Sequence, residues 1–189
     1  VASGEPAVIR LRVPDHREIL FDDLVRGRVR FDTAVIGDPV LVRSDGMPAY
    51  NFAVVVDDAL MEITHVIRGE DHISNTPRQL LLYEAFGWMP PAFAHLSLVM
   101  GPDHSPLSKR HGATSVKEFR ERGYLPEALA NYLALLGWSP GEGEELLPIE
   151  ELARRFTLEK AGHSASVFDT EELAWVNRAL VEFDHQTVV

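Results

Sequence analysis

The stretch from residue 50 to 115 constrains the fold most, because short apolar runs alternate there with a helical pattern. Residues 52–56 form a continuous apolar run, which is typical of a strand buried on both faces of a parallel sheet. Two further runs, 63–67 and 96–100, flank a segment that opens with Asn75, Thr76 and Pro77 and stops at Gly87, as a helix would. Strand, helix and strand of these lengths predict a parallel α/β sheet.

A polar loop, GPDHSPLSKRHGAT, follows the last of these runs and occupies residues 101–114. It contains Lys109, one of only three lysines in the chain. A lysine on a mobile loop can follow charge onto a leaving phosphate group, so the loop is a candidate polyphosphate site. A solvated turn that carries two cations fits the same residues, because short basic motifs occur by chance. The residues alone leave both interpretations open.

Ligands of open α/β sheets bind beyond the carboxyl ends of the strands. Arg68, Asp71 and Lys109 each follow a predicted strand, so we expect them at one rim of the sheet. The planar guanidinium of Arg68 suits a carboxylate ligand. A structural ion pair of Arg68 with Glu70 or Asp71 is the alternative, and the sequence does not decide between them.

The first 49 residues are predicted to be rich in strands, with candidates at residues 8–13 and 25–31 and a closing turn at 44–48. Side chains alternate along a strand, so Arg26, Arg28 and Arg30 would share one face. Such a stripe either protects a sheet edge by its charge or contacts phosphate groups. Both interpretations stay open.

The last third of the chain is predicted to be helical. Helices are expected over residues 115–122, 126–137, 149–156 and 171–180, with a linker at 139–145. Ser115 with Glu118, and Asp169 with Glu172, have the spacing of capping boxes.

Composition excludes several function classes. The chain has no cysteine, no apolar run near the roughly 18 residues of a membrane span, and a net charge of −11. Thiolate metal sites, disulfides and indiscriminate nucleic-acid binding are therefore not expected, and a cytoplasmic location is compatible. The eight histidines show no metal-binding spacing, and there is no P-loop, GxGxxG or GxSxG motif, so no metal site and no hydrolase chemistry are predicted.

Several runs together resemble a bacterial-type glutamyl-tRNA synthetase. The matching segments are YNFAVVVDD at 50–58, ITHVIRGEDH at 63–72, SNTP at 74–77, LSKRHGA at 107–113, LPEAL at 125–129 and NYLALLGW at 131–138. The loop around Lys109 is similar to the KMSKS motif of class I synthetases. The resemblance covers essentially the whole chain in register.

The resemblance implies a class I, Rossmann-like α/β fold in three parts. Residues 1–49 would be the later part of an acceptor-stem-binding insertion. Residues 50–115 would be the second half of the catalytic domain, and residues 116–189 a helical stem-contact region. The implied activity is that of a glutamate–tRNA ligase, in which glutamate is activated by ATP, usually with Mg²⁺, and transferred to the tRNA for glutamate.

The resemblance also assigns residues. Lys109 and Ser108 would neutralise the departing phosphates, with Val99 and Asp71 also near the nucleotide. Tyr50, Val54 and Arg68 would lie at the glutamate. Arg26, Arg28 and Arg30 become candidates for contact with tRNA.

Departures from the family pattern limit these implications. Pro106 stands where the motif has its first lysine, and Val54 stands where some members carry an asparagine. The HIGH-type half of the catalytic domain, the anticodon-binding domain and the zinc-binding cysteines of some members are absent, so we predict no zinc. We expect a middle piece of a monomeric parent, inactive alone and able to self-associate through exposed sheet edges.

Two alternatives belong to other functional classes. A stand-alone tRNA-binding module would use the arginine stripe without chemistry and would show salt-dependent binding with no effect of nucleotide. A shortened synthetase paralogue would glutamylate a modified tRNA base. Such paralogues keep the first half-sheet and lack the long helical segment that follows Gly137 here.

Overall fold

The computed structural model describes residues 6–112, 114–141 and 144–186 of the 189-residue chain. Its contacts divide the chain into two compact units, Val1–His95 and Leu96–Val189. The predicted division into residues 1–49, 50–115 and 116–189 concerns roles in a larger protein and stays a prediction. The two units divide the chain differently, because strands from both sides of residue 50 share one sheet.

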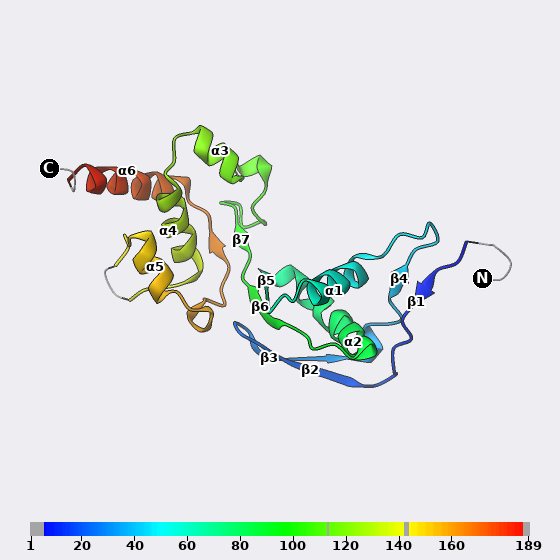
Figure 1. Ribbon diagram of the computed structural model, residues 1–189. Coiled ribbons are helices and arrows are strands. Elements are labelled where there is room, and N and C mark those ends of the chain that lie inside the picture. Colours follow the sequence, from blue (N-terminus) through cyan, green and yellow to red (C-terminus); the bar gives the residue numbers. More distant parts are fainter. Residues whose placement is uncertain (1–5, 113, 142–143, 187–189) are drawn as a thin grey trace. The chain divides into compact units, whose positions relative to one another are not determined.

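The first unit contains a mixed four-stranded sheet of order β3-β2-β6-β5 with two helices (Figure 1). Its elements are β1 (Ile9–Arg10), β2 (Glu18–Asp23), β3 (Gly27–Asp32), β4 (Val40–Val42), α1 (Tyr50–Leu60), β5 (His65–Gly69), α2 (Thr76–Phe86) and β6 (Ala92–Leu96), with 3-10 turns at Thr33–Val35 and Glu70–Asn75. Strand β2 is antiparallel to β3 and parallel to β6. The α/β class is confirmed, but the expected purely parallel sheet is wrong, because a hairpin forms one side of it.

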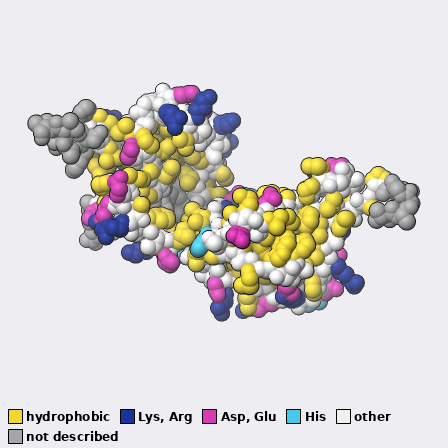
Figure 2. Space-filling view, in the orientation of Figure 1, with side chains coloured by type: hydrophobic (Ala, Val, Ile, Leu, Met, Phe, Trp, Pro, Cys, Tyr) yellow, Lys and Arg dark blue, Asp and Glu magenta, His cyan; other side chains and the backbone are white. Residues whose placement is uncertain are grey.

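The strand predicted at residues 52–56 is wrong, because these residues lie in helix α1. Phe52, Val55 and Ala59 belong to one hydrophobic cluster with Leu82 and Tyr83 of α2. Their spacing of three and four residues is helical, but a short apolar run hides such a period from sequence inspection. Other apolar residues stay exposed near the end of α1, and Figure 2 shows hydrophobic side chains on the face of this unit that carries the two helices.

Three predicted strands differ in their bounds. Only Ile9–Arg10 of residues 8–13 is extended in a ladder, and there it pairs with β4. Strand β3 begins at Gly27 rather than residue 25, because a turn precedes it in which Asp23 accepts hydrogen bonds from the backbone of Val25 and Arg26. Strand β5 starts two residues later than residue 63.

Helix α2 confirms the signals of Pro77 and Gly87, but the side chain of Asn75, expected as a cap, makes no capping hydrogen bond. Pro77 lies in its first turn, where the missing N–H of proline costs no helical hydrogen bond. Gly87 follows the last helical residue with φ of 69°, a left-handed conformation that glycine adopts without steric cost. The turn predicted at residues 44–48 is also present, and Gly46 has φ of 83°.

The single strand predicted at residues 96–100 is wrong. Strand β6 ends at Leu96, and the separate strand β7 (Val99–Met100) pairs with β8 (Ser166–Val167) in another sheet. Ser97 lies between them and its hydroxyl donates to the carbonyl of Gly162. The apolar run thus serves two sheets, one in each unit.

The second unit is mainly helical, as predicted. Besides β7 and β8 it contains α3 (Val116–Glu121), α4 (Pro126–Gly137), α5 (Ile149–Arg155) and α6 (Thr170–Gln186), with 3-10 turns at Lys109–His111 and Leu158–Lys160. Its main core joins Ala128 and Tyr132 of α4 to Leu173 of α6, and Phe168 packs with them. The Ser115–Glu118 capping box is present. The side chain of Asp169 caps α6. The N–H of Asp169, which a capping box would direct to Glu172, donates to the hydroxyl of Tyr132 instead. Among the described helices, none is both long and apolar enough to cross a membrane.

Candidate functional site

Arg68, near the end of β5, is held by neutral side chains. Its Nε donates to Nε2 of His95 at 3.1 Å. Its Nη2 donates to Oγ1 of Thr76 and to Oε1 of Gln79, each at 2.9 Å. The guanidinium carbon also lies 5.7 Å from the centre of the Phe93 ring, within cation–π range. These contacts fix the guanidinium without neutralising its charge.

The acidic residues near Arg68 have other partners. Glu70 pairs with Arg26 at 2.7 Å. Asp71 is exposed and lies 3.7 Å from Nε2 of His72. Among the described residues, no carboxylate lies within 4.0 Å of the Arg68 guanidinium, which rules out the structural ion pair that the sequence left open. A half-buried cation of this kind can accept a carboxylate ligand.

Burial lowers the pKa of Arg68, while Tyr50, Asp58 and Asp71 oppose this effect. Burial also raises the pKa of the Asp58 carboxyl group, although the charge of Arg68 lowers it. The site therefore has a desolvated positive charge with weak compensation, which strengthens attraction for an anionic ligand.

Two candidate glutamate-binding residues, Tyr50 and Val54, lie on one face of α1. Tyr50 is its first residue and Val54 follows four positions later, which places both on the same side of a helix. The Tyr50 ring lies 6.0 Å from the ring of His72, centre to centre, and Tyr50 interacts electrostatically with Arg68, which opposes the lowering of the pKa of Arg68 by burial. Val54 is half-buried and offers only apolar surface.

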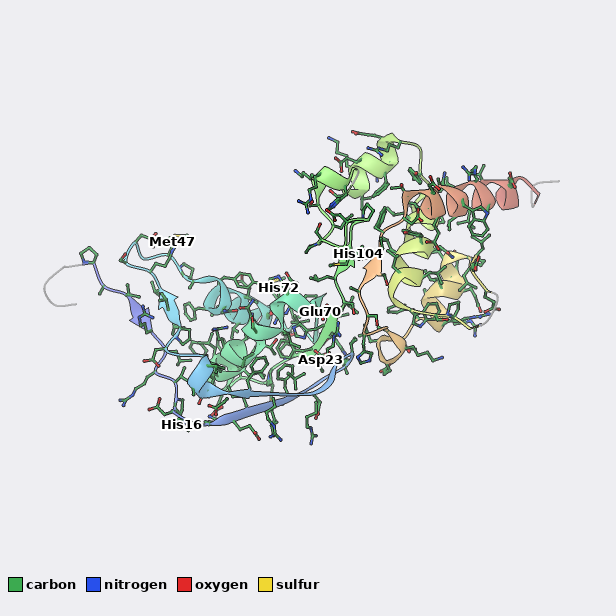
Figure 3. The ribbon with its side chains drawn as sticks, turned by 180° about the vertical axis from the view of Figure 1, so that it is seen from behind. His16, Asp23, Met47, Glu70, His72 and His104 are labelled. Carbon is green, nitrogen blue, oxygen red and sulfur yellow. The ribbon has the colours of Figure 1, made fainter. Side chains whose placement is uncertain are left out.

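Asp23 and His95 were not predicted from the sequence, and they lie behind Arg68 with their side chains fully buried. Asp23 lies at the end of β2, in the same part of the unit as Glu70 (Figure 3). Its Oδ2 is 2.6 Å from Nδ1 of His95 on β6. The available sequence signal was a histidine between two apolar residues, Ala94 and Leu96, and an aspartate two positions after Phe21 in an alternating strand.

The second unit carries the phosphate-site candidates. Lys109 opens a 3-10 turn, and Ser108 precedes it with a backbone N–H that donates to Nδ1 of His111 at 3.1 Å. Arg110 forms an ion pair with Asp103 at 3.3 Å. Lys109 is exposed and has no ion pair among the described residues, so it is the loop cation available to an outside anion.

The remaining loop candidates are backbone elements of the same unit. Val99 lies in β7, and its carbonyl accepts a hydrogen bond from the N–H of Leu107 at 2.9 Å, which ties the start of the loop to its middle. Ala113, the last motif residue, lies outside the described residues. Arg68 and Asp71 belong to the first unit and Lys109 to the second, so their expected convergence at one rim stays a prediction.

The predicted arginine stripe is wrong in one member. Arg28 and Arg30 lie on β3 with exposed side chains, opposite β2, and pair with Asp22 and Glu18 at 2.9 and 3.0 Å. Arg26 precedes the strand, and its side chain is only 16% exposed. The turn at Asp23 removes it from the alternation on which the prediction was based.

Comparison with known proteins decides the family. A family model described as tRNA synthetases class I (E and Q), catalytic domain, matches residues 1–175. The chain belongs to this family. The resemblance seen in its motifs is thereby confirmed.

Two curated relatives are named glutamate–tRNA ligases. That of Heliobacterium modesticaldum is 58% identical over 176 residues, covering 93% of this chain and 36% of the relative. That of Aquifex aeolicus is 58% identical over 175 residues, covering 92% and 37%. The synthetase chain therefore spans little more than a third of the length of these relatives.

A solved structure supports the fold. The glutamate–tRNA ligase of Elizabethkingia meningosepticum, in complex with its amino acid, matches with a TM-score of 0.86 and 40% identity. The match covers 94% of this chain and 39% of that one.

Proposed function

We propose that this chain supplies the glutamate-binding side and the pyrophosphate-facing loop of a glutamate–tRNA ligase. The observation that carries the proposal is Arg68, a half-buried cation whose side-chain partners among the described residues are neutral. The side-chain carboxylate of glutamate is the complementary ligand, because the α-carboxylate is the group that reacts with ATP, and Tyr50 adds a second polar group near Arg68. The names of the relatives support the same substrate.

The reaction requires a carboxylate of glutamate to attack the α-phosphate of ATP, with pyrophosphate as the leaving group. Positioning and charge stabilisation dominate such a step. Lys109, with the backbone around Ser108, neutralises the leaving phosphates. Val99 and Asp71 lie toward the nucleotide.

Mg²⁺ is the metal expected with ATP. Among the described residues, no group of three His, Asp or Glu side chains is arranged to hold a metal. We therefore assign Mg²⁺ to the phosphates of the nucleotide, since this ion often keeps water and binds substrate oxygens rather than a protein cage.

The tRNA is the third substrate. Arg28 and Arg30 are exposed on the edge strand β3 and are the residues we assign to its backbone, with Arg26 as a half-buried support. Their partners Asp22 and Glu18 must give way, because each arginine is paired in the free chain. The proposed place of action is the cytoplasm, where tRNA is charged.

Titration of the chain with L-glutamate tests the proposal directly. We expect NMR shifts of the Tyr50 and Arg68 side chains with L-glutamate, and a response at least about 10-fold weaker with L-glutamine, because the loss of a charge-assisted pair costs about 1.5–3 kcal/mol. Arg68→Gln should abolish the response. Arg78→Gln is the control, since in the described part of the chain the Arg78 side chain hydrogen-bonds only to the carbonyl of Ser74. Equal responses to the two amino acids would refute the assignment.

The phosphate loop has a separate test. We expect Lys109→Ala to weaken binding of magnesium pyrophosphate by about 10-fold or more. Lys117→Ala removes an exposed lysine of α3 in the same unit and should leave the affinity unchanged. If both substitutions have the same small effect, the loop is an ordinary solvated turn.

Binding of tRNA distinguishes a synthetase from a simple RNA-binding module. Replacing Arg28 and Arg30 by glutamine should reduce the slope of log K against log salt by about 1 to 2, and Arg43→Gln should not. A synthetase chain should also bind glutamate and pyrophosphate, whereas a module would bind only tRNA. Sedimentation of the same samples measures the predicted self-association.

A further inference from the structure

A buried row of polar side chains connects Asp23 with Arg68. Asp23 and His95 have no exposed side-chain surface, and their closest atoms are 2.6 Å apart. On the other side of the imidazole ring, Nε2 of His95 lies 3.1 Å from Nε of Arg68. Thr76, which is also buried, places its hydroxyl oxygen 3.2 Å from the same ring nitrogen. The row therefore ends at Arg68, the residue proposed to bind glutamate.

The chemistry of the end groups fixes the proton on His95. Burial raises the pKa of Asp23, but hydrogen bonds from the backbone of Arg26, from the His95 side chain and from the backbone of Val25 outweigh it and hold the pKa below its usual range. The carboxylate is thus an acceptor only, and Nδ1 of His95 must donate to it. Arginine nitrogens are donors only, so Nε2 must accept from Nε of Arg68. The neutral Nδ1–H tautomer is the one that satisfies both ends.

The other contacts of the guanidinium have equally fixed directions. Gln79 donates through Nε2 to Oδ1 of Asn51 at 3.0 Å, which turns its Oε1 toward Arg68. Thr76 accepts from Nη2 of Arg68, and its own proton is then free for His95. Both the Nε and the Nη2 atoms of Arg68 thus have hydrogen-bond acceptors. The orientation of the guanidinium plane therefore depends on Nε2 of His95 remaining an acceptor.

We propose that Asp23 and His95 form a positioning relay, in which Asp23 fixes the His95 tautomer and His95 aims the Arg68 guanidinium at the glutamate carboxylate. The inference rests on the proposed function of Arg68. Neither Asp23 nor His95 is expected to touch the substrate, because both side chains are fully buried. A buried pair with a merely structural role would stabilise the unit without any dependence of glutamate binding on the tautomer.

Asp23→Asn is the decisive variant, because it keeps the shape of the side chain and reverses the direction of one hydrogen bond, the one to Nδ1 of His95. Oδ1 of Asp23 accepts from the N–H groups of Val25, Arg26 and His95, so the asparagine oxygen is expected to keep that place. Its NH₂ group then faces Nδ1 of His95 and donates to it. The proton of the ring then moves to Nε2 of His95. Two N–H donors, one from His95 and one from Arg68, now face each other, and the hydrogen bond between them is lost. Asp22→Asn, on the exposed neighbour, is the matched control.

Long-range proton–nitrogen NMR reports the tautomer without any ligand. We expect the Nδ1–H form in the wild-type chain and in Asp22→Asn, and the Nε2–H form in Asp23→Asn. Titration with L-glutamate should then show about 10-fold weaker binding in Asp23→Asn only, with the melting temperature measured in parallel. An Nε2–H tautomer in the wild type, or unchanged glutamate affinity after the tautomer reverses, would overturn the relay.

A second pair of variants covers the case in which Asp23→Asn fails to fold. The amide of His95→Gln reaches the place of Nε2 and can accept from Arg68, whereas that of His95→Asn reaches only the place of Nδ1. We expect His95→Gln to keep glutamate binding within about threefold and His95→Asn to lose at least 10-fold. Equal losses in the two variants contradict the relay.

The outcomes separate this inference from the proposed function. If the wild-type chain does not respond to L-glutamate, the function assigned to Arg68 fails. The relay is then judged by two NMR observations. One is the His95 tautomer in the wild-type chain, and the other is whether the Arg68 Nε–H resonance, protected by its hydrogen bond to His95, is lost in Asp23→Asn. Retention of that resonance would refute the relay independently of any ligand.

Discussion

At the residue scale, two buried tyrosines differ in a single hydrogen bond. The hydroxyl of Tyr132 accepts from the N–H of Asp169 at 2.7 Å, whereas the buried hydroxyl of Tyr83 has no partner among the described residues. Their rings are similarly enclosed, at 1% and 2% exposure. Each side chain thus serves as a control for the other.

We predict that Tyr132→Phe destabilises the chain by about 1 kcal/mol, because the part-buried N–H of Asp169 loses its acceptor. Tyr83→Phe should be neutral or stabilising by up to about 1 kcal/mol, because it removes a buried group that makes no hydrogen bond. Urea unfolding measures both. A larger loss for Tyr83→Phe would mean that its hydroxyl has a partner.

Gly101 is required for space rather than for backbone conformation. A Cβ at this position would lie 2.7 Å from Cε1 of His111, whose side chain is only 7% exposed and is tied to Asp103 and Ser108. The ring cannot move aside without breaking those contacts. The start of the loop that carries Lys109 therefore depends on this glycine.

We predict that Gly101→Ala destabilises the second unit by about 1–3 kcal/mol, the usual cost of overpacking. Gly137→Ala has nothing within 4 Å of its added Cβ and should change stability by less than about 0.5 kcal/mol. Thermal unfolding of the two variants tests this. Equal stability would show that the His111 ring repacks freely.

At the element scale, the start of α3 depends on a carboxylate. Glu118 accepts hydrogen bonds from the backbone of Thr114 and from both the hydroxyl and the N–H of Ser115, and these contacts lower its pKa to about 2. The folded chain thus favours the charged form. The contribution of Glu118 is complete above about pH 4.5 and is lost as the pH falls toward 2.

We predict that the Glu118 carboxyl titrates near pH 2 in a carbon-13 NMR titration, and that Ser115→Ala moves this value upward toward 4.5 by removing one donor. The exposed Ser164, replaced in the same way, is the control. A titration near pH 4.5 in the unchanged chain would show that the capping box is open in solution.

At the scale of the whole molecule, each of the two units has a hydrophobic cluster of its own. Leu173 of α6 is fully buried in the core of the second unit. Leu82 of α2 is 1% exposed in a cluster of the first unit. Units with their own cores commonly unfold as separate cooperative bodies.

We predict two thermal transitions by calorimetry. Leu173→Ala should lower one of them and Leu82→Ala the other, each by about 2–5 kcal/mol of unfolding free energy. The exposed Leu133, replaced by alanine, should affect neither by more than about 1 kcal/mol. A single transition that both core variants shift would mean that the chain unfolds as one body.

The sequence by itself determined the features that depend on neighbouring residues. Pro77, Gly87 and the Ser115–Glu118 pair locate helix ends correctly, because capping and left-handed turns are decided within a few residues. The family also came from sequence motifs, and the proposal that Arg68 binds glutamate started from them.

The tertiary structure alone decided the rest. Residues 52–56 form a helix because Val55 packs on α2, and an apolar run carries no information about its distant partner. Asp23 and His95 are 72 residues apart in sequence and meet only because β2 and β6 are neighbours in the sheet. Hydrogen bonds between such distant residues follow from chain topology, which local residue preferences do not specify.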